Sequence, residues 1–214
     1  MSDLLPPSVF SDLEPAIVWK HFAILCEIPR ASKAEAPLRQ HLQSWATAHG
    51  LPATVDAAGN LLVRKAASAG REHRPGVILQ AHLDMVCQNN AETPHDFSRD
   101  PIRPLRRDGW LVAEGTTLGA DNGIGVALML AVLEDRALQH GPIEALFTVD
   151  EEAGMGGARG LAADSTGIAT TAVASRGRAL RAVPPCRLAR RSDNGPSRSR
   201  RTRTSSLIAL PRSS

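Results

Sequence analysis

Three clusters of acidic and histidine residues could carry chemistry in this sequence. His82 and Asp84 lie in QAHLDMV, Asp121 lies in GTTLGADNGIG, and Glu151 and Glu152 lie in LFTVDEEAGMGG. Each cluster stands at the end of a strand-like apolar run or in the loop beyond one. Loops beyond the carboxyl ends of strands in an open α/β sheet can converge on one crevice. Imidazole and carboxylate groups are ligands for zinc and manganese, so the pattern predicts a divalent metal site.

Each cluster also has a simpler interpretation. Residues two apart in a strand share a face, so His82 and Asp84 could be a hydrogen-bonded pair. The glycines around Asp121 could form a plain turn into a helix or an anion-binding helix N-terminus, although no GK[ST] follows as a phosphate loop requires. The glutamate pair could begin a solvated helix, because acidic residues favour helix N-termini. All three clusters in this order favour the metal site over these alternatives.

Nucleophilic catalysis has little support in the sequence. There is no GxSxG motif, and Cys87 has no dedicated base apparent in the sequence. The cysteines Cys26, Cys87 and Cys186 are odd in number and widely spaced, which argues against a disulfide framework and favours a reducing, cytoplasmic location.

Helical and strand-like patterns alternate along the first three quarters of the chain. Val18, Phe22 and Leu25 lie at helical spacing before Pro29, and LLVRK and VILQAHLD are apolar strand-like runs. The expected order is two helices, three strands, a helix and a strand, at 12–30, 34–50, 53–56, 61–65, 77–84, 122–138 and 143–150. This alternation predicts an α/β fold with a mostly parallel mixed sheet flanked by helices on both faces.

Composition limits the class of protein. Of the 214 residues 43% are hydrophobic but only 3% are aromatic, so the core must be mainly aliphatic. The N-terminal MSDLLPPSVFSDLEP is acidic where a signal peptide would be basic. The longest apolar run, VALMLAVL, is too short to cross a bilayer. We therefore expect neither export nor membrane association.

The charge is divided unevenly along the chain. Residues 165–214 contain 11 arginines, one aspartate and neither lysine nor glutamate, although the whole chain has a net charge of only +3. This segment is rich in Ser, Ala and Pro and has no sustained hydrophobic period, which indicates disorder. Its arginines could bind nucleic acid through phosphates, but it has no aromatic residues for stacking, so we expect no nucleic-acid partner.

Longer motifs resemble a known family. The segments VILQAHLDMVCQNN, HDFSRDPI, GTTLGADNGIGVALMLAVLED and HGPIEALFTVDEEAGMGGARGL are similar in order and spacing to the bacterial Xaa-His dipeptidases, also called aminoacyl-histidine or cytosol non-specific dipeptidases. These belong to the co-catalytic zinc peptidase family, which includes carnosinases, aminoacylases and carboxypeptidase G. The resemblance covers about residues 12–162 and implies a metallopeptidase catalytic domain that hydrolyses small peptides, Xaa-His dipeptides among them.

The resemblance also implies a role for each candidate residue. His82 and Glu152 correspond to ligands of two different metal ions, and Asp121 corresponds to the carboxylate that bridges them, followed by a cis peptide bond. Asp84 corresponds to the acid that orients the imidazole, and Glu151 to the general base. Zinc is the expected metal, with cobalt or manganese as alternatives.

The rest of the family pattern is missing after residue 162. The family continues with an aspartate ligand, an inserted lid and dimerisation domain that makes the family homodimeric, and a last histidine ligand. We therefore expect a partial catalytic domain at 1–163 and a frameshifted, disordered tail at 164–214. Activity of this chain should be impaired or absent, and the alternatives are an inactive metal-binding fragment or an aminoacylase-type deacylase.

Overall fold

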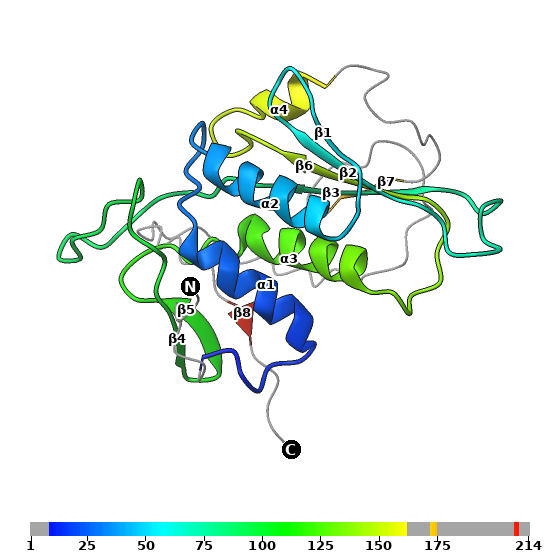
Figure 1. Cartoon of the computed structure of the whole chain (residues 1–214). Helices are drawn as coiled ribbons and strands as arrows, with labels where there is room; N and C mark the ends of the chain where they lie inside the picture. The colour runs from blue at the N-terminus through cyan, green and yellow to red at the C-terminus, as the bar shows by residue number, and fades with distance from the viewer. Residues whose placement is uncertain (1–8, 162–171, 175–207, 210–214) are drawn as a thin grey trace, which may run out of the picture.

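The computed structural model describes residues 9–161, 172–174 and 208–209 (Figure 1). The helices are α1 (Ala16–Glu27), α2 (Ala36–Ala48), α3 (Ala120–Glu134) and α4 (Gly156–Arg159). The strands are β1 (Ala53–Val55), β2 (Leu61–Lys65), β3 (Val77–His82), β4 (Pro104–Arg107), β5 (Trp110–Ala113), β6 (Ile143–Thr148), β7 (Ala172–Ala174) and β8 (Ile208–Ala209). The seven elements expected from the sequence are all present, with ends that differ by a few residues.

The main sheet has five strands in the order β1-β2-β6-β3-β7. β2 pairs antiparallel with both β1 and β6, whereas β3 pairs parallel with both β6 and β7. The α/β class with a mixed sheet is therefore confirmed, and among the described strands of this sheet two pairs are parallel and two are antiparallel. In the β3–β6 register His82 lies opposite Thr148, so these two strands end at the same edge of the sheet.

The three long helices cover one face of this sheet. Figure 1 shows α1, α2 and α3 together on one side, with α3 packed against α1 and β3 and α2 against β1 and β2. The side chains between these layers are mainly aliphatic, as the composition indicated, with Phe22 and Phe147 as fully buried exceptions. Burial of this apolar surface is the main driving force for assembling the layers. The sequence also predicted helical cover on the second face, and no long helix of the described residues lies there (Figure 1).

A β-hairpin that the element pattern did not predict lies between β3 and α3. Its strands β4 and β5 pair antiparallel and are joined by Asp108 and Gly109, both of which have positive φ. Such values at both central residues are typical of a type I′ turn, for which Asp-Gly is a preferred sequence. The Asp-Gly pair in PLRRDGWLVA was therefore an available signal for this hairpin.

The C-terminal region is described at only two short strands. β7 adds to the main sheet beside β3, and β8 pairs with β5. The expected disorder and frameshift origin of 164–214 otherwise fall outside the described residues. Among the described residues, no helix is both long enough and apolar enough to span a bilayer.

Candidate metal centre

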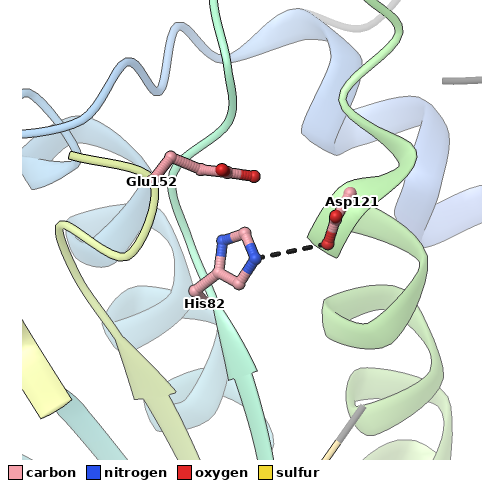
Figure 2. Close-up of side chains that lie close together, drawn as sticks. All are labelled: His82, Asp121 and Glu152. Atoms are coloured by element: carbon pink, nitrogen blue, oxygen red, sulfur yellow. Dashed lines mark ion pairs between the residues drawn. The ribbon is translucent and has the colours of Figure 1, made fainter. Parts of the chain in front are cut away.

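The edge where β3 and β6 end brings the three sequence clusters together. His82 is the last residue of β3, Glu152 lies on the loop that follows β6, and Asp121 lies at the start of α3. Figure 2 shows the three side chains directed toward a common space from these separate elements. Segments that are far apart in the sequence therefore meet at one place, as the clustering of acids and histidine at strand ends predicted.

Three potential ligand atoms lie close together at this end of the sheet. One atom each from His82, Asp121 and Glu152 lies within 4.8 Å of the others. The Nε2 atom of His82 is 3.3 Å from Oδ1 of Asp121, the pair drawn as a dashed line in Figure 2. Imidazole nitrogen and carboxylate oxygen are usual donors to zinc, so these three atoms form a candidate divalent metal site. Within the described ranges this is the single group of this kind.

The hydrogen bonding of His82 supports a ligand role for Nε2. The other ring nitrogen, Nδ1, lies 3.0 Å from the backbone carbonyl oxygen of Asp84, and a carbonyl oxygen can only accept a hydrogen bond. Nδ1 therefore carries the hydrogen, and in a neutral imidazole Nε2 then presents its lone pair toward the oxygen of Asp121. A lone pair and a carboxylate oxygen facing each other favour a cation between them, which is the arrangement that a metal-ligating histidine needs.

Asp84 joins the histidine loop to the glutamate loop. The backbone N–H of Glu151 donates to its Oδ1 and the N–H of Glu152 to its Oδ2, both at 3.0 Å, and Ser32 Oγ donates to Oδ2 at 2.7 Å. Burial by itself would raise the pKa of this fully buried carboxyl group. The hydrogen bonds from His82, Ser32 and the two amides outweigh burial and hold the pKa of Asp84 well below its usual range. Asp84 therefore stays ionised and fixes both loops.

The local charges also shift the pKa of two proposed ligands. Burial tends to lower the pKa of His82, but the hydrogen bond and negative charge of Asp84 and the charge of Glu151 raise it overall. Burial raises the pKa of Glu152, and the charges of Glu151 and Asp121 add to this effect. The contributions of neighbouring charges to both pKa shifts reflect a concentration of negative charge, which a bound cation would relieve.

Glu151 lies beside the three candidate ligands rather than among them. Its Oε2 atom is 3.9 Å from Nε2 of His82, and its side chain is one-third exposed. The neighbouring Asp150, which has a positive φ of 55°, turns the backbone between β6 and this pair. Adjacent glutamates thus have different surroundings, so they can have different tasks.

Arg30 is a buried residue of this site that the sequence patterns did not single out. Its guanidinium donates to the backbone carbonyls of Leu83 at 3.0 Å and of Gly119 at 2.5 Å. Burial lowers the pKa of Arg30, although the charges of Cys26, Cys87 and Asp84 oppose this. The side chain links the loop after His82 to the loop before Asp121. Only the position of Arg30 directly after Pro29, just before the polar stretch ASKAE, hinted at a turn here.

Comparison with known proteins places these features in a family. The model of Peptidase family M20/M25/M40 matches residues 78–184, which is half of the chain. The chain belongs to this family. The matched part contains all five candidate site residues. It also continues past residue 163, so the expected domain boundary stays a prediction.

Individual relatives agree with the family match. The chain is 52% identical over 154 residues to the cytosol non-specific dipeptidase of Escherichia coli, covering 72% of this chain and 32% of that protein. The structure of the aminoacylhistidine dipeptidase of Vibrio alginolyticus matches with a TM-score of 0.74 and 49% identity, over 77% of this chain and 34% of that one. A tripeptidase structure from Staphylococcus aureus matches with a TM-score of 0.62 and 25% identity, over 75% and 43% of the two chains.

The matches agree with the resemblance seen in the sequence, and they define its extent. The chain spans about a third of the length of the two dipeptidases that it matches. The peptide bond between Asp121 and Asn122 is cis, as the resemblance implied.

Proposed function

We propose that this chain carries the metal-binding part of a dipeptidase active site. The main support is that His82, Asp121 and Glu152 each place a possible ligand atom within 4.8 Å of the others. In this proposal His82, Asp121 and Glu152 would hold a pair of divalent metal ions, with His82 and Glu152 as ligands of different ions. Zinc suits this donor set best, and cobalt or manganese are alternatives.

The surrounding residues of the chain have separate tasks in the proposed chemistry. A bound pair of divalent metal ions supplies Lewis acidity, which polarises a peptide carbonyl and lowers the pKa of water. Asp84 and its backbone carbonyl keep the imidazole of His82 in the tautomer that leaves Nε2 free. Glu151, one-third exposed beside the ligands, accepts the proton of the attacking water and returns it to the leaving amine nitrogen.

The substrate class and the level of activity also belong to the proposal. Two of the relatives are named as a non-specific dipeptidase and an aminoacylhistidine dipeptidase, so we propose dipeptides, Xaa-His dipeptides among them, as substrates. The name of the Escherichia coli relative also supports a cytosolic location. Because the described residues provide a single group of three ligands, we propose that this chain alone hydrolyses peptides weakly or not at all.

Hydrolysis of a small substrate panel tests this proposal. The full chain is incubated with β-alanyl-histidine, alanyl-histidine and an N-acetyl amino acid, each with added Zn²⁺, Mn²⁺ or Co²⁺. We expect slow, metal-dependent release of histidine that the variant Glu151→Gln abolishes. Faster release of the free amino acid from the N-acetyl amino acid would favour a deacylase instead. Metal binding without any hydrolysis would leave a metal-binding fragment, and hydrolysis unaffected by Glu151→Gln would refute the assigned base.

A further inference from the structure

Four consecutive backbone N–H groups at residues 149–152 donate to side chains from earlier parts of the chain. The first, at Val149, donates to Oδ1 of the buried Asn60 at 3.2 Å. The last two donate to the carboxylate of Asp84. The start of the loop that carries the glutamate pair is therefore held by side chains at four successive amides, because it has left the hydrogen-bond ladder of β6.

The remaining amide of the four, at Asp150, is held by Glu35. Its N–H donates to Oε1 of Glu35 at 2.8 Å, and the same oxygen accepts the N–H of Lys33 at 3.0 Å. Glu35 is 5% exposed and immediately precedes α2, on the segment that connects α1 to α2. A buried carboxylate is costly unless hydrogen bonds compensate it, so these contacts are a substantial constraint on the backbone.

The same connecting segment supports the site at two points. Ser32 donates to Asp84, which orients His82, and Glu35 accepts from the residue that directly precedes the glutamate pair. A shift of Glu35 would move Asp150 and, through it, the direction in which the next two side chains leave the backbone. Groups that hold metal ligands in place by hydrogen bonds commonly influence metal affinity in this way, because they fix the orientation of the ligands.

We propose that Glu35 is a positioning residue of this metal site, which it affects through the backbone of Asp150 and without contacting the metal. This inference rests on the proposed function, since it concerns the same three ligands. It adds the connection between α1 and α2 to the parts of the chain that determine metal affinity.

Cobalt titration of the full chain tests the role of Glu35. The visible absorption of Co²⁺ changes when protein side chains coordinate the ion, so it reports metal binding without any hydrolysis. We expect Glu35→Ala to weaken Co²⁺ binding about 10-fold to 100-fold, the range seen when groups that orient metal ligands are removed. Glu35→Gln keeps an acceptor oxygen for the same amide, so it should bind within about 3-fold of the unaltered chain by the same reasoning.

A buried glutamate on β6, Glu144, provides the matched control. Glu144 is fully buried near the start of β6 and pairs with Arg64 at 2.9 Å, at the end of the strand opposite the metal site. Glu144→Ala should therefore lower stability while leaving the Co²⁺ affinity of the folded protein unchanged. Circular dichroism under the titration conditions establishes that each variant is folded.

The possible outcomes separate this inference from the proposed function. Equal Co²⁺ affinity of Glu35→Ala and the unaltered chain would overturn the role of Glu35, and so would an equal loss in Glu144→Ala. If Glu35→Ala does not fold, Glu35→Asp replaces it, because its shorter side chain withdraws the oxygen from Asp150. Binding by Glu35→Asp as tight as by Glu35→Gln would then overturn the inference. Absence of Co²⁺ binding by the unaltered chain would overturn the proposed function itself, and this inference with it.

Discussion

The carboxylate of Asp84 accepts the backbone N–H of Glu152 at 3.0 Å, although the two residues are 68 positions apart in the sequence. This bond links the end of one parallel strand to the end of its neighbour. The residue that orients the proposed histidine ligand therefore also fixes the backbone of a proposed carboxylate ligand. The two ligands cannot shift independently of each other.

Replacing Asp84 by Asn should cost much of the stability of this edge. The new amide would direct its NH₂ group at one of the two backbone N–H donors and would remove the negative charge, and hydrogen bonds to a charged acceptor contribute about 1.5–3 kcal/mol each. We expect the free energy of unfolding, measured with urea, to fall by at least about 2 kcal/mol on that basis. Asp100→Asn is the control, since Asp100 also accepts a backbone N–H but is more exposed. Similar losses for both variants would contradict the role given to Asp84.

Two glycines with nearly the same backbone angle provide a test of packing around Arg30. Gly119 has φ +69 and Gly50 has φ +68, but a Cβ atom on Gly50 would have no neighbour within 4 Å. A Cβ on Gly119 would overlap Arg30 and lie 2.6 Å from Sδ of Met85. Gly50→Ala should cost about 1–2 kcal/mol for the left-handed conformation. Gly119→Ala should cost about 1–3 kcal/mol more because it overpacks the site. Equal urea midpoints would show that Arg30 and Met85 adjust freely.

The two adjacent glutamates should respond differently to the same substitution. Glu152→Gln removes a proposed metal ligand, so Zn²⁺ affinity measured by isothermal titration calorimetry should fall at least about 10-fold. Glu151→Gln should leave that affinity nearly unchanged, because Glu151 lies beside the ligands and acts on the proton. A larger loss of affinity for Glu151→Gln than for Glu152→Gln would reverse the two assigned roles.

Stability should decline in mild acid because of a buried histidine away from the site. His21 is 2% exposed and its Nε2 lies 2.8 Å from Oε2 of Glu134. Burial lowers the pKa of His21 more than Glu134 raises it, so the unfolded chain binds the proton more readily. The stability that comes from burying neutral His21 is fully present above the unfolded pKa of about 6.5. It is lost as the pH falls from there toward the folded pKa.

The variant His21→Gln tests this pH dependence. Its amide can still donate to Glu134 but does not titrate, so stability should decrease less between pH 7.5 and pH 5.5 than in the unaltered chain. Burial also lowers the pKa of His41, so some of the slope remains. His73→Gln, at an exposed position, should keep the full slope. An unchanged slope in His21→Gln would refute the assignment.

Regular patterns in the sequence predicted the helices and central strands well. Val18, Phe22 and Leu25 are all buried on α1, because a helix that packs on a sheet must present one apolar face. The hairpin of β4 and β5 was missed because its strands are short and partly polar, so that only the Asp-Gly turn marks it.

The buried polar residues around the site could not be predicted in the same way. Arg30, Glu35 and Asn60 are all at most 5% exposed, yet charged and amide residues are ordinarily found at the surface. Each is buried because it satisfies backbone groups of a segment that is distant in the sequence. Such pairings depend on the tertiary arrangement, which local periodicity does not encode.

Equilibrium dialysis with Zn²⁺ is the most direct test of the proposed metal site. The unaltered chain is compared with His82→Ala and Asp121→Ala, and with Asp96→Ala as a control at an exposed carboxylate that bonds only locally. We expect the unaltered chain and Asp96→Ala to bind Zn²⁺ alike, and both site variants to lose at least about 10-fold in affinity. Equal Zn²⁺ binding by all four proteins would contradict a metal site at His82, Asp121 and Glu152.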